Sequence, residues 1–157
     1  MDKTLKSFRP VWPLLAAGAV AIVVGGMVAA FSAANPSRIA LWASAYLVLV
    51  IGVVQILIGV GMAFVHEKLI ARQVWTIFAL LNIGSLSILI GTVMKTQMTN
   101  SFSVVIAGSI VYVAAMVLGL LGLRGSHSSW WRFDYVALLI AGIVSAGIGA
   151  VLSSLGR

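Results

Sequence analysis

Histidine and acidic side chains are the groups best suited to catalysis or metal binding, and this 157-residue sequence has few of them. It contains two histidines, three acidic residues and no cysteine, which excludes disulfides, thiolate metal sites and a thiol nucleophile. His66, His127, Glu67 and Asp134 could hold a metal ion or perform acid–base chemistry if they converged. However, the histidines have no fixed spacing, and each acid has a cation close by in the sequence. We therefore predict no metal centre, no cofactor and no enzymatic activity.

Neutral polar side chains inside long apolar runs are the second group of residues that could bind a ligand or another helix. Gln55 and Asn82 lie at nearly equal distances from the middle of the connection between their runs. On an antiparallel pair of helices they would share one depth, where an interhelical hydrogen bond is worth about 0.6–2 kcal/mol. Ser85 follows Asn82 by one turn and shares its face. We interpret the three residues as an interhelical polar contact, and the alternative is a contact with a polar ligand.

The composition places these groups in a membrane. Hydrophobic residues make up 62% of the chain and charged residues 8%, whereas a soluble domain carries about 25% charged residues. Five apolar runs are each long enough to cross the hydrocarbon core as a helix. The sequence therefore predicts an all-α fold, a polytopic membrane helix bundle with five transmembrane helices in a single domain, residues 1–157. The predicted spans are 11–34, 39–65, 74–94, 102–123 and 135–155.

The middle of every predicted span lacks ionisable residues. Proton relays, ion-coupled transport and voltage sensing require such groups inside the membrane. The sequence therefore argues against a proton-coupled transporter built from this chain alone.

The basic residues indicate an orientation. Three of the ten basic residues lie on one predicted side of the membrane. The other seven lie on the opposite side, at the N-terminus or in the connections after the second and fourth runs. The seven are Lys3, Lys6, Arg9, Lys68, Arg72, Arg124 and Arg132. The bias predicts the N-terminus inside and the C-terminus outside. With a net charge of +7 concentrated at the ends of apolar runs, we expect anionic lipid headgroups as partners and no nucleic acid. The predicted location is a bacterial or archaeal plasma membrane.

Glycines recur at helical spacing within the apolar runs. Small residues allow helix backbones to approach closely, which stabilises helix pairs in lipid. We predict helix packing at Gly18, Gly25, Gly52, Gly59, Gly84, Gly91, Gly142 and Gly149. A pore or sliding surface lined by glycine is the alternative.

A short pattern recurs 61 residues along the chain. Residues 61–72 and 122–132 each run from glycine through histidine to arginine. This raises the hypothesis of two tandem hairpins that follow a lone first helix.

Residues 72–124 resemble small bacterial membrane proteins related to subunit I of the haem–copper oxidases. The residues that carry the resemblance are Arg72, Trp75, Asn82, Gly84, Gly91, Gly108 and Arg124. That family binds haem and copper through histidines inside its spans, and this sequence has none there. The resemblance therefore implies a relative without the metal ligands, or a partner subunit, and not the redox function.

Three functional hypotheses remain open. The first is a non-catalytic membrane protein, an accessory or assembly subunit of a larger membrane complex or a homo-oligomer. The second is a small channel, carrier or lipid-binding protein with a polar path at Gln55 and Asn82. The third is an enzyme whose site is formed by His66, Glu67, His127 and Asp134.

Overall fold

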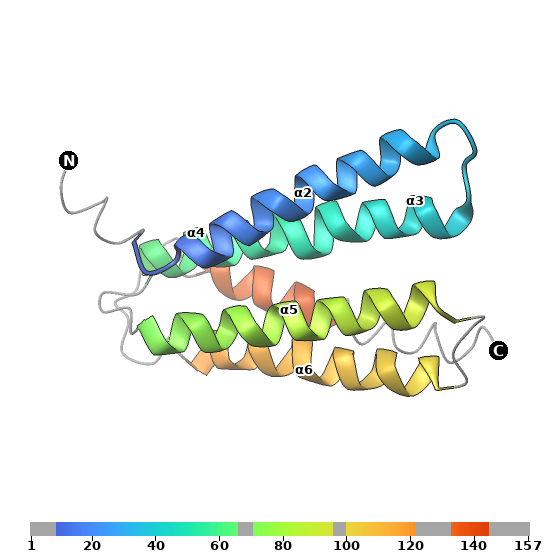
Figure 1. The fold of residues 1–157 in the computed structure, drawn as a ribbon. Coiled ribbons are helices and arrows are strands. Elements are labelled where there is room, and N and C mark those ends of the chain that lie inside the picture. Colours follow the sequence, from blue (N-terminus) through green and yellow to red (C-terminus); the bar gives the residue numbers. More distant parts are fainter. Residues whose placement is uncertain (1–8, 66–70, 96–99, 122–132, 145–157) are drawn as a thin grey trace.

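The computed structural model describes residues 9–65, 71–95, 100–121 and 133–144 (Figure 1). The described part is helical and contains no β-strand, which confirms the predicted all-α fold for these residues. The helices are α2 (Trp12–Ser32), α3 (Arg38–Ala45), η1 (Tyr46–Val53), α4 (Val54–Val65), α5 (Ala71–Val93), α6 (Ser101–Leu121) and the helix Phe133–Val144.

Four helical stretches of the described residues are long and apolar enough to cross a membrane. Three are α2, α5 and α6, and the fourth is Arg38–Phe64, in which α3, η1 and α4 follow one another without a break. Their bounds are Trp12–Ser32, Arg38–Phe64, Ala71–Val93 and Ser101–Leu121. They contain 21, 27, 23 and 21 residues, so at ~1.5 Å rise per residue each covers roughly 30 Å or more. They overlap the first four predicted spans. For the fifth, the structure describes the apolar helix Phe133–Val144, and residues 145–155 of that prediction lie outside the described residues.

The third span begins earlier than predicted. Helix α5 starts at Ala71, so Arg72 lies in its first turn and not in the connection before it. No helix-breaking residue separates Ala71 from Val74. A long arginine side chain can also keep its charged group in water while its stem lies along an apolar helix.

Local signals start the first two spans. Pro13 lies in the first turn of α2, where its missing N–H costs no hydrogen bond. Ser37 caps α3, because its hydroxyl accepts a hydrogen bond from the Ala40 backbone N–H at 3.1 Å. Pro36 stands between the two helices, so the chain reverses at this point.

The second span changes helix type along its length. It begins as α3, continues as the π-helix η1 over Tyr46–Val53 and ends as α4. A π-helix bonds each residue to one five positions away, and short π-helical turns inside α-helices are frequent at functional sites. The apolar pattern of this run did not predict it.

The four long helices form two antiparallel hairpins, one above the other in Figure 1. In the first, α2 packs against the continuous helix α3–η1–α4, and in the second, α5 packs against α6. The hypothesis of a lone first helix is therefore wrong for the described residues, because α2 is itself part of a hairpin.

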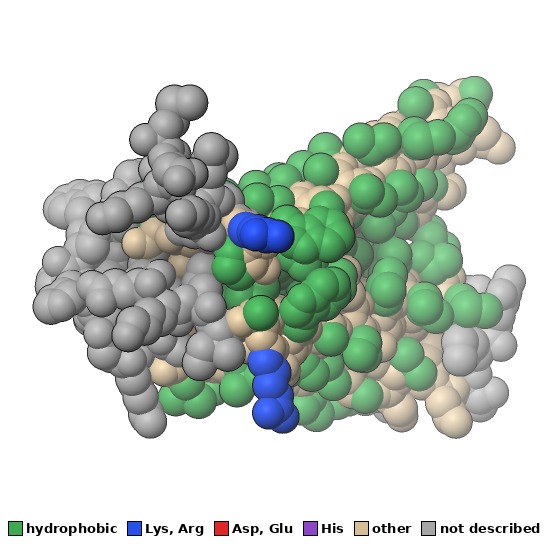
Figure 2. Space-filling view, turned by 60° about the vertical axis from the view of Figure 1, so that its left-hand side comes forward, with side chains coloured by type: hydrophobic (Ala, Val, Ile, Leu, Met, Phe, Trp, Pro, Cys, Tyr) green, Lys and Arg blue, Asp and Glu red, His purple; other side chains and the backbone are tan. Residues whose placement is uncertain are grey.

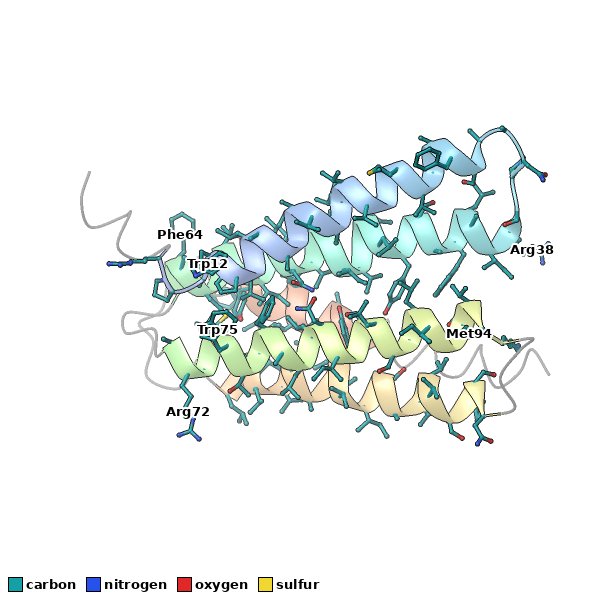
Figure 3. All side chains as sticks on the ribbon, in the orientation of Figure 1. Trp12, Arg38, Phe64, Arg72, Trp75 and Met94 are labelled. Atoms are coloured by element: carbon teal, nitrogen blue, oxygen red, sulfur yellow. The ribbon has the colours of Figure 1, made fainter. Side chains whose placement is uncertain are left out.

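The buried core lies toward one end of the bundle. We call this end, where α2 and α5 begin and α4 and α6 end, the Trp12 end, and the opposite end the Arg38 end (Figure 3). The helix Phe133–Val144 contributes Tyr135 and Leu139 to this core. The other core residues are Val11, Leu14, Ile58, Met62, Ala63, Val74, Ile77, Leu81, Tyr112, Ala115 and Met116. Figure 2 shows apolar side chains over much of the described surface, as expected of helices that face lipid.

Candidate functional site

A pair of amides joins the two hairpins in the middle of the bundle. Gln55 donates from Nε2 to Asn82 Oδ1 at 3.1 Å, and Asn82 Nδ2 lies 3.5 Å from Gln55 Oε1. Asn82 also donates to the backbone carbonyl of Phe78 at 2.8 Å. The Gln55 side chain is 1% exposed, so its hydrogen-bonding groups must find protein partners rather than water.

The neighbouring helix positions explain why these amides face each other. Gln55 is flanked on its face of the second span by Ile51 and Ile58, which are both buried. Ser85, three residues after Asn82 on α5, is also buried. Since residues three and four apart share a helix face, burial of these neighbours turns both amides toward the interior.

A second polar group, which the sequence analysis only partly identified, lies between η1, α5 and α6. Ser85 is 1% exposed, and its hydroxyl faces that of Tyr46, the first residue of η1. Tyr112 of α6 lies near enough to Tyr46 to interact electrostatically. Neither the Tyr46 hydroxyl nor the Ser85 hydroxyl makes a hydrogen bond of good geometry with the described residues.

Tyr46 could have been singled out from the sequence by its position. It follows Trp42 by one helical turn, and the two rings stack at a centroid distance of 5.0 Å and an interplanar angle of 23°. Tyr46 therefore continues the aromatic contact from Trp42, near the Arg38 end, toward Ser85.

The chemistry of these groups is limited to neutral hydrogen bonding. Amides and hydroxyls can orient a ligand or join helices, but a proton relay needs groups that change charge. No group of three or more histidine, cysteine or acidic residues that could hold a metal ion occurs among the described residues. His66, Glu67 and His127 lie outside the described residues, and Asp134 is exposed. The hypothesis of a site at these four residues therefore stays a prediction.

Four glycines of the first hairpin, Gly18, Gly25, Gly52 and Gly59, lie where its two helices pack closely. A Cβ atom at Gly18 would lie 2.7 Å from the carbonyl oxygen of Gly52, and one at Gly52 would lie 3.1 Å from that of Gly18. At Gly25 a Cβ would lie 3.0 Å from the Ser44 carbonyl oxygen. A Cβ at Gly59 would lie 3.2 Å from the Leu14 Cβ.

The second hairpin is packed by the same means. A Cβ at Gly84 would lie 2.9 Å from the carbonyl oxygen of Gly108, and one at Gly91 would lie 3.0 Å from that of Ser101. Gly108 is not among the glycines predicted to pack helices, although it is one of the residues that carry the family resemblance. Gly142, on the helix Phe133–Val144, faces Met116. Gly149 lies outside the described residues.

Comparisons of the chain with protein-family models, with curated proteins and with solved structures find no match. The resemblance of residues 72–124 to the haem–copper oxidase group therefore stays a prediction. Fold and site together define a class: a helical bundle with four candidate membrane spans and a neutral polar contact between two hairpins.

Proposed function

We propose that this protein is a non-catalytic integral membrane subunit that assembles with other membrane proteins or with copies of itself. The amide pair is the observation that carries this proposal. Gln55 and Asn82 direct their hydrogen bonds to each other and to the Phe78 carbonyl. Because these groups already have partners, they act to hold the two hairpins together rather than to bind a substrate.

The outer face of α2 supports assembly with a neighbour. Gly26 has no atom within 4 Å of where its Cβ would lie, in contrast to the other glycine of the same helix turn, Gly25. Ala19 and Ala30 are exposed on the same face as Gly26. Small residues on a lipid-facing helix permit a second helix to approach closely, so α2 is the helix on which we place the partner.

The full topology belongs to the same proposal. It has five spans, the fifth continuing from the helix Phe133–Val144 to residue 155, with the N-terminus inside and the C-terminus outside. The membrane is the plasma membrane of a bacterium or archaeon, with anionic lipids around the Trp12 end. If residues 72–124 are related to the haem–copper oxidase group, the chain is either a relative without the metal ligands or a partner subunit of such a complex.

The test is purification of the intact chain from its native membrane in a mild detergent or in nanodiscs, followed by mass spectrometry of the proteins that accompany it. We expect a stoichiometric membrane partner or a homo-oligomer. Gly26→Leu should abolish that association while the monomer stays folded. Val20→Leu is the matched control, because Val20 is exposed on α2 about 120° away from Gly26. A protein that is monomeric before any substitution would contradict the proposal.

The Tyr46 and Ser85 hydroxyls favour a second candidate function, a small carrier or lipid-binding protein. If these two buried hydroxyls pair with each other, one O–H and the remaining lone pairs are still available to a ligand that carries a hydroxyl or carbonyl group. Under this hypothesis the purified protein retains a small organic molecule that is detected by mass spectrometry after extraction. Tyr46→Phe with Ser85→Ala should release the molecule, and an empty wild-type protein would count against it.

A further inference from the structure

One short motif occurs twice, at the start of α2 and at the start of α5. Residues 9–12 read Arg-Pro-Val-Trp, and residues 72–75 read Arg-Gln-Val-Trp. Both stretches lie at the Trp12 end, because α2 and α5 begin there. Arg9 lies in the turn that precedes α2, and Arg72 lies in the first turn of α5, so each motif places an arginine three residues before a tryptophan at this end.

The valines of the two motifs bring them together. Val11 and Val74 are both 0% exposed and belong to the same core. Their burial fixes the rotation of each helix, so that the next residue of each, Trp12 or Trp75, meets the other. The two rings lie 6.3 Å apart at an interplanar angle of 83°, an edge-to-face pair (Figure 3). Phe78 extends the cluster, 5.4 Å from Trp75.

The aromatic cluster stays largely exposed. Trp12 is 57% exposed and Trp75 48% exposed, although each contacts the other. Tryptophan rings in membrane proteins prefer the interfacial layer, where lipid headgroups meet acyl chains. We therefore expect the exposed surface of Trp12 and Trp75 to lie in this interfacial layer.

Two cations lie at the same end of the bundle as this aromatic surface. Arg9 and Arg72 are exposed, and Figure 2 shows two basic patches at this end with apolar side chains between them. Figure 3 shows Arg72 directed outward from α5. Each guanidinium group can bind a phosphate, so the two positive charges match the two negative charges of a lipid that carries two phosphates.

We propose that the two Arg-x-Val-Trp motifs form a binding site for a phospholipid that carries two phosphate groups. Arg9 and Arg72 each bind one phosphate, and the acyl chains lie against Trp12, Trp75 and Phe78. Charge complementarity and the aromatic surface select a lipid over a free anion. The site is independent of the proposed subunit function, which requires neither arginine.

The experiment is a titration of the detergent-solubilised full chain with cardiolipin, the two-phosphate lipid, followed by native mass spectrometry. The test variant is Arg9→Gln with Arg72→Gln. The matched control is Arg38→Gln with Lys95→Gln, which removes the same charge at the Arg38 end. Each arginine near the membrane surface contributes roughly fivefold to binding, so we expect cardiolipin affinity to fall about 25-fold in the test variant and less than about twofold in the control.

Three further measurements keep the site and the lipid distinct. Arg9→Lys with Arg72→Lys preserves charge and should retain most of the affinity, which shows that the glutamine variant fails through lost charge and not through misfolding. Phosphatidylglycerol at equal phosphate concentration should bind more weakly than cardiolipin, and inorganic phosphate should not displace it. Equal loss in the test and control variants, equal binding of both lipids, or displacement by inorganic phosphate would each overturn the proposal.

Discussion

Gly84 and Gly108 face each other across the α5–α6 hairpin without a side chain between them. A Cβ at Gly84 would lie 2.7 Å from the Tyr112 backbone nitrogen, and one at Gly108 would lie 2.8 Å from the Gly84 carbonyl oxygen. Both neighbours are backbone atoms, which cannot rotate out of the way as a side chain can. This contact therefore sets the distance between the two helices.

Gly84→Ala should destabilise the protein by about 1–3 kcal/mol, because the added methyl group forces the helices apart. Gly26→Ala is the control. It adds the same methyl group where no atom of the chain itself lies within 4 Å, and alanine is the better helix former, so the stability of the monomer should be equal or slightly higher. Unfolding by sodium dodecyl sulfate in mixed micelles, followed by tryptophan fluorescence, measures both. A Gly84→Ala protein as stable as the wild type would show that the hairpin can open at no cost.

The amide pair should be asymmetric in its response to substitution. In Asn82→Leu, the buried Gln55 loses its partner and is left unsatisfied. In Gln55→Leu, Asn82 keeps its hydrogen bond to the Phe78 carbonyl. Asn82→Leu should therefore cost more stability than Gln55→Leu.

The double variant tests whether the two amides interact directly. We expect a coupling free energy of about 0.6–2 kcal/mol between Gln55→Leu and Asn82→Leu in the same unfolding assay. Additive effects of the two substitutions would mean that the contact contributes nothing as a pair.

Removal of the Tyr46 hydroxyl should not weaken the ligand-free protein. Tyr46→Phe deletes a buried group that makes no well-formed hydrogen bond, so unfolding free energy should stay constant or rise by up to about 1 kcal/mol. Ser109→Ala is the comparison, because the Ser109 hydroxyl donates to the Val105 carbonyl at 2.9 Å. A clear loss of stability in Tyr46→Phe would reveal a bound water or ligand at this hydroxyl.

Two methionines distinguish the core from the lipid-facing surface. Met62 is 0% exposed and belongs to the core, whereas Met27 is 52% exposed on α2. Met62→Ala should cost about 2–5 kcal/mol, because it leaves a cavity between packed helices. Met27→Ala should change the unfolding free energy by less than about 0.5 kcal/mol. Equal effects would contradict the placement of the core at the Trp12 end.

The two hairpins use equivalent contacts at different spacings. Gly25 faces Ser44 and Val48, and Gly91 faces Ser101 and Val105 in the same way. Gly52 follows Ser44 by eight positions, whereas Gly108 follows Ser101 by seven. The π-helix η1 lies between Ser44 and the end of this stretch, and its wider turns accommodate the additional residue. We infer that the π-helix keeps Gly52 in register with Gly18.

Several features of the protein could be predicted from the sequence alone. The helical class and the positions of four long apolar helices follow from run length and charge distribution, because a chain in lipid must satisfy its backbone hydrogen bonds within each segment. The common depth of Gln55 and Asn82 follows from counting residues along an antiparallel pair.

Other features depended on the tertiary structure. When a helix is apolar on all sides, its sequence pattern does not show which face packs against another helix. The pairing of α2 with the second span, and of α5 with α6, therefore emerged only from the tertiary structure. Nor could sequence reasoning place Tyr46 beside Ser85 or Trp12 against Trp75, since those contacts depend on helix rotation about the axis. Rotation is decided by close backbone packing at the glycines and by burial of residues such as Val11 and Val74, which exist only once the helices are assembled.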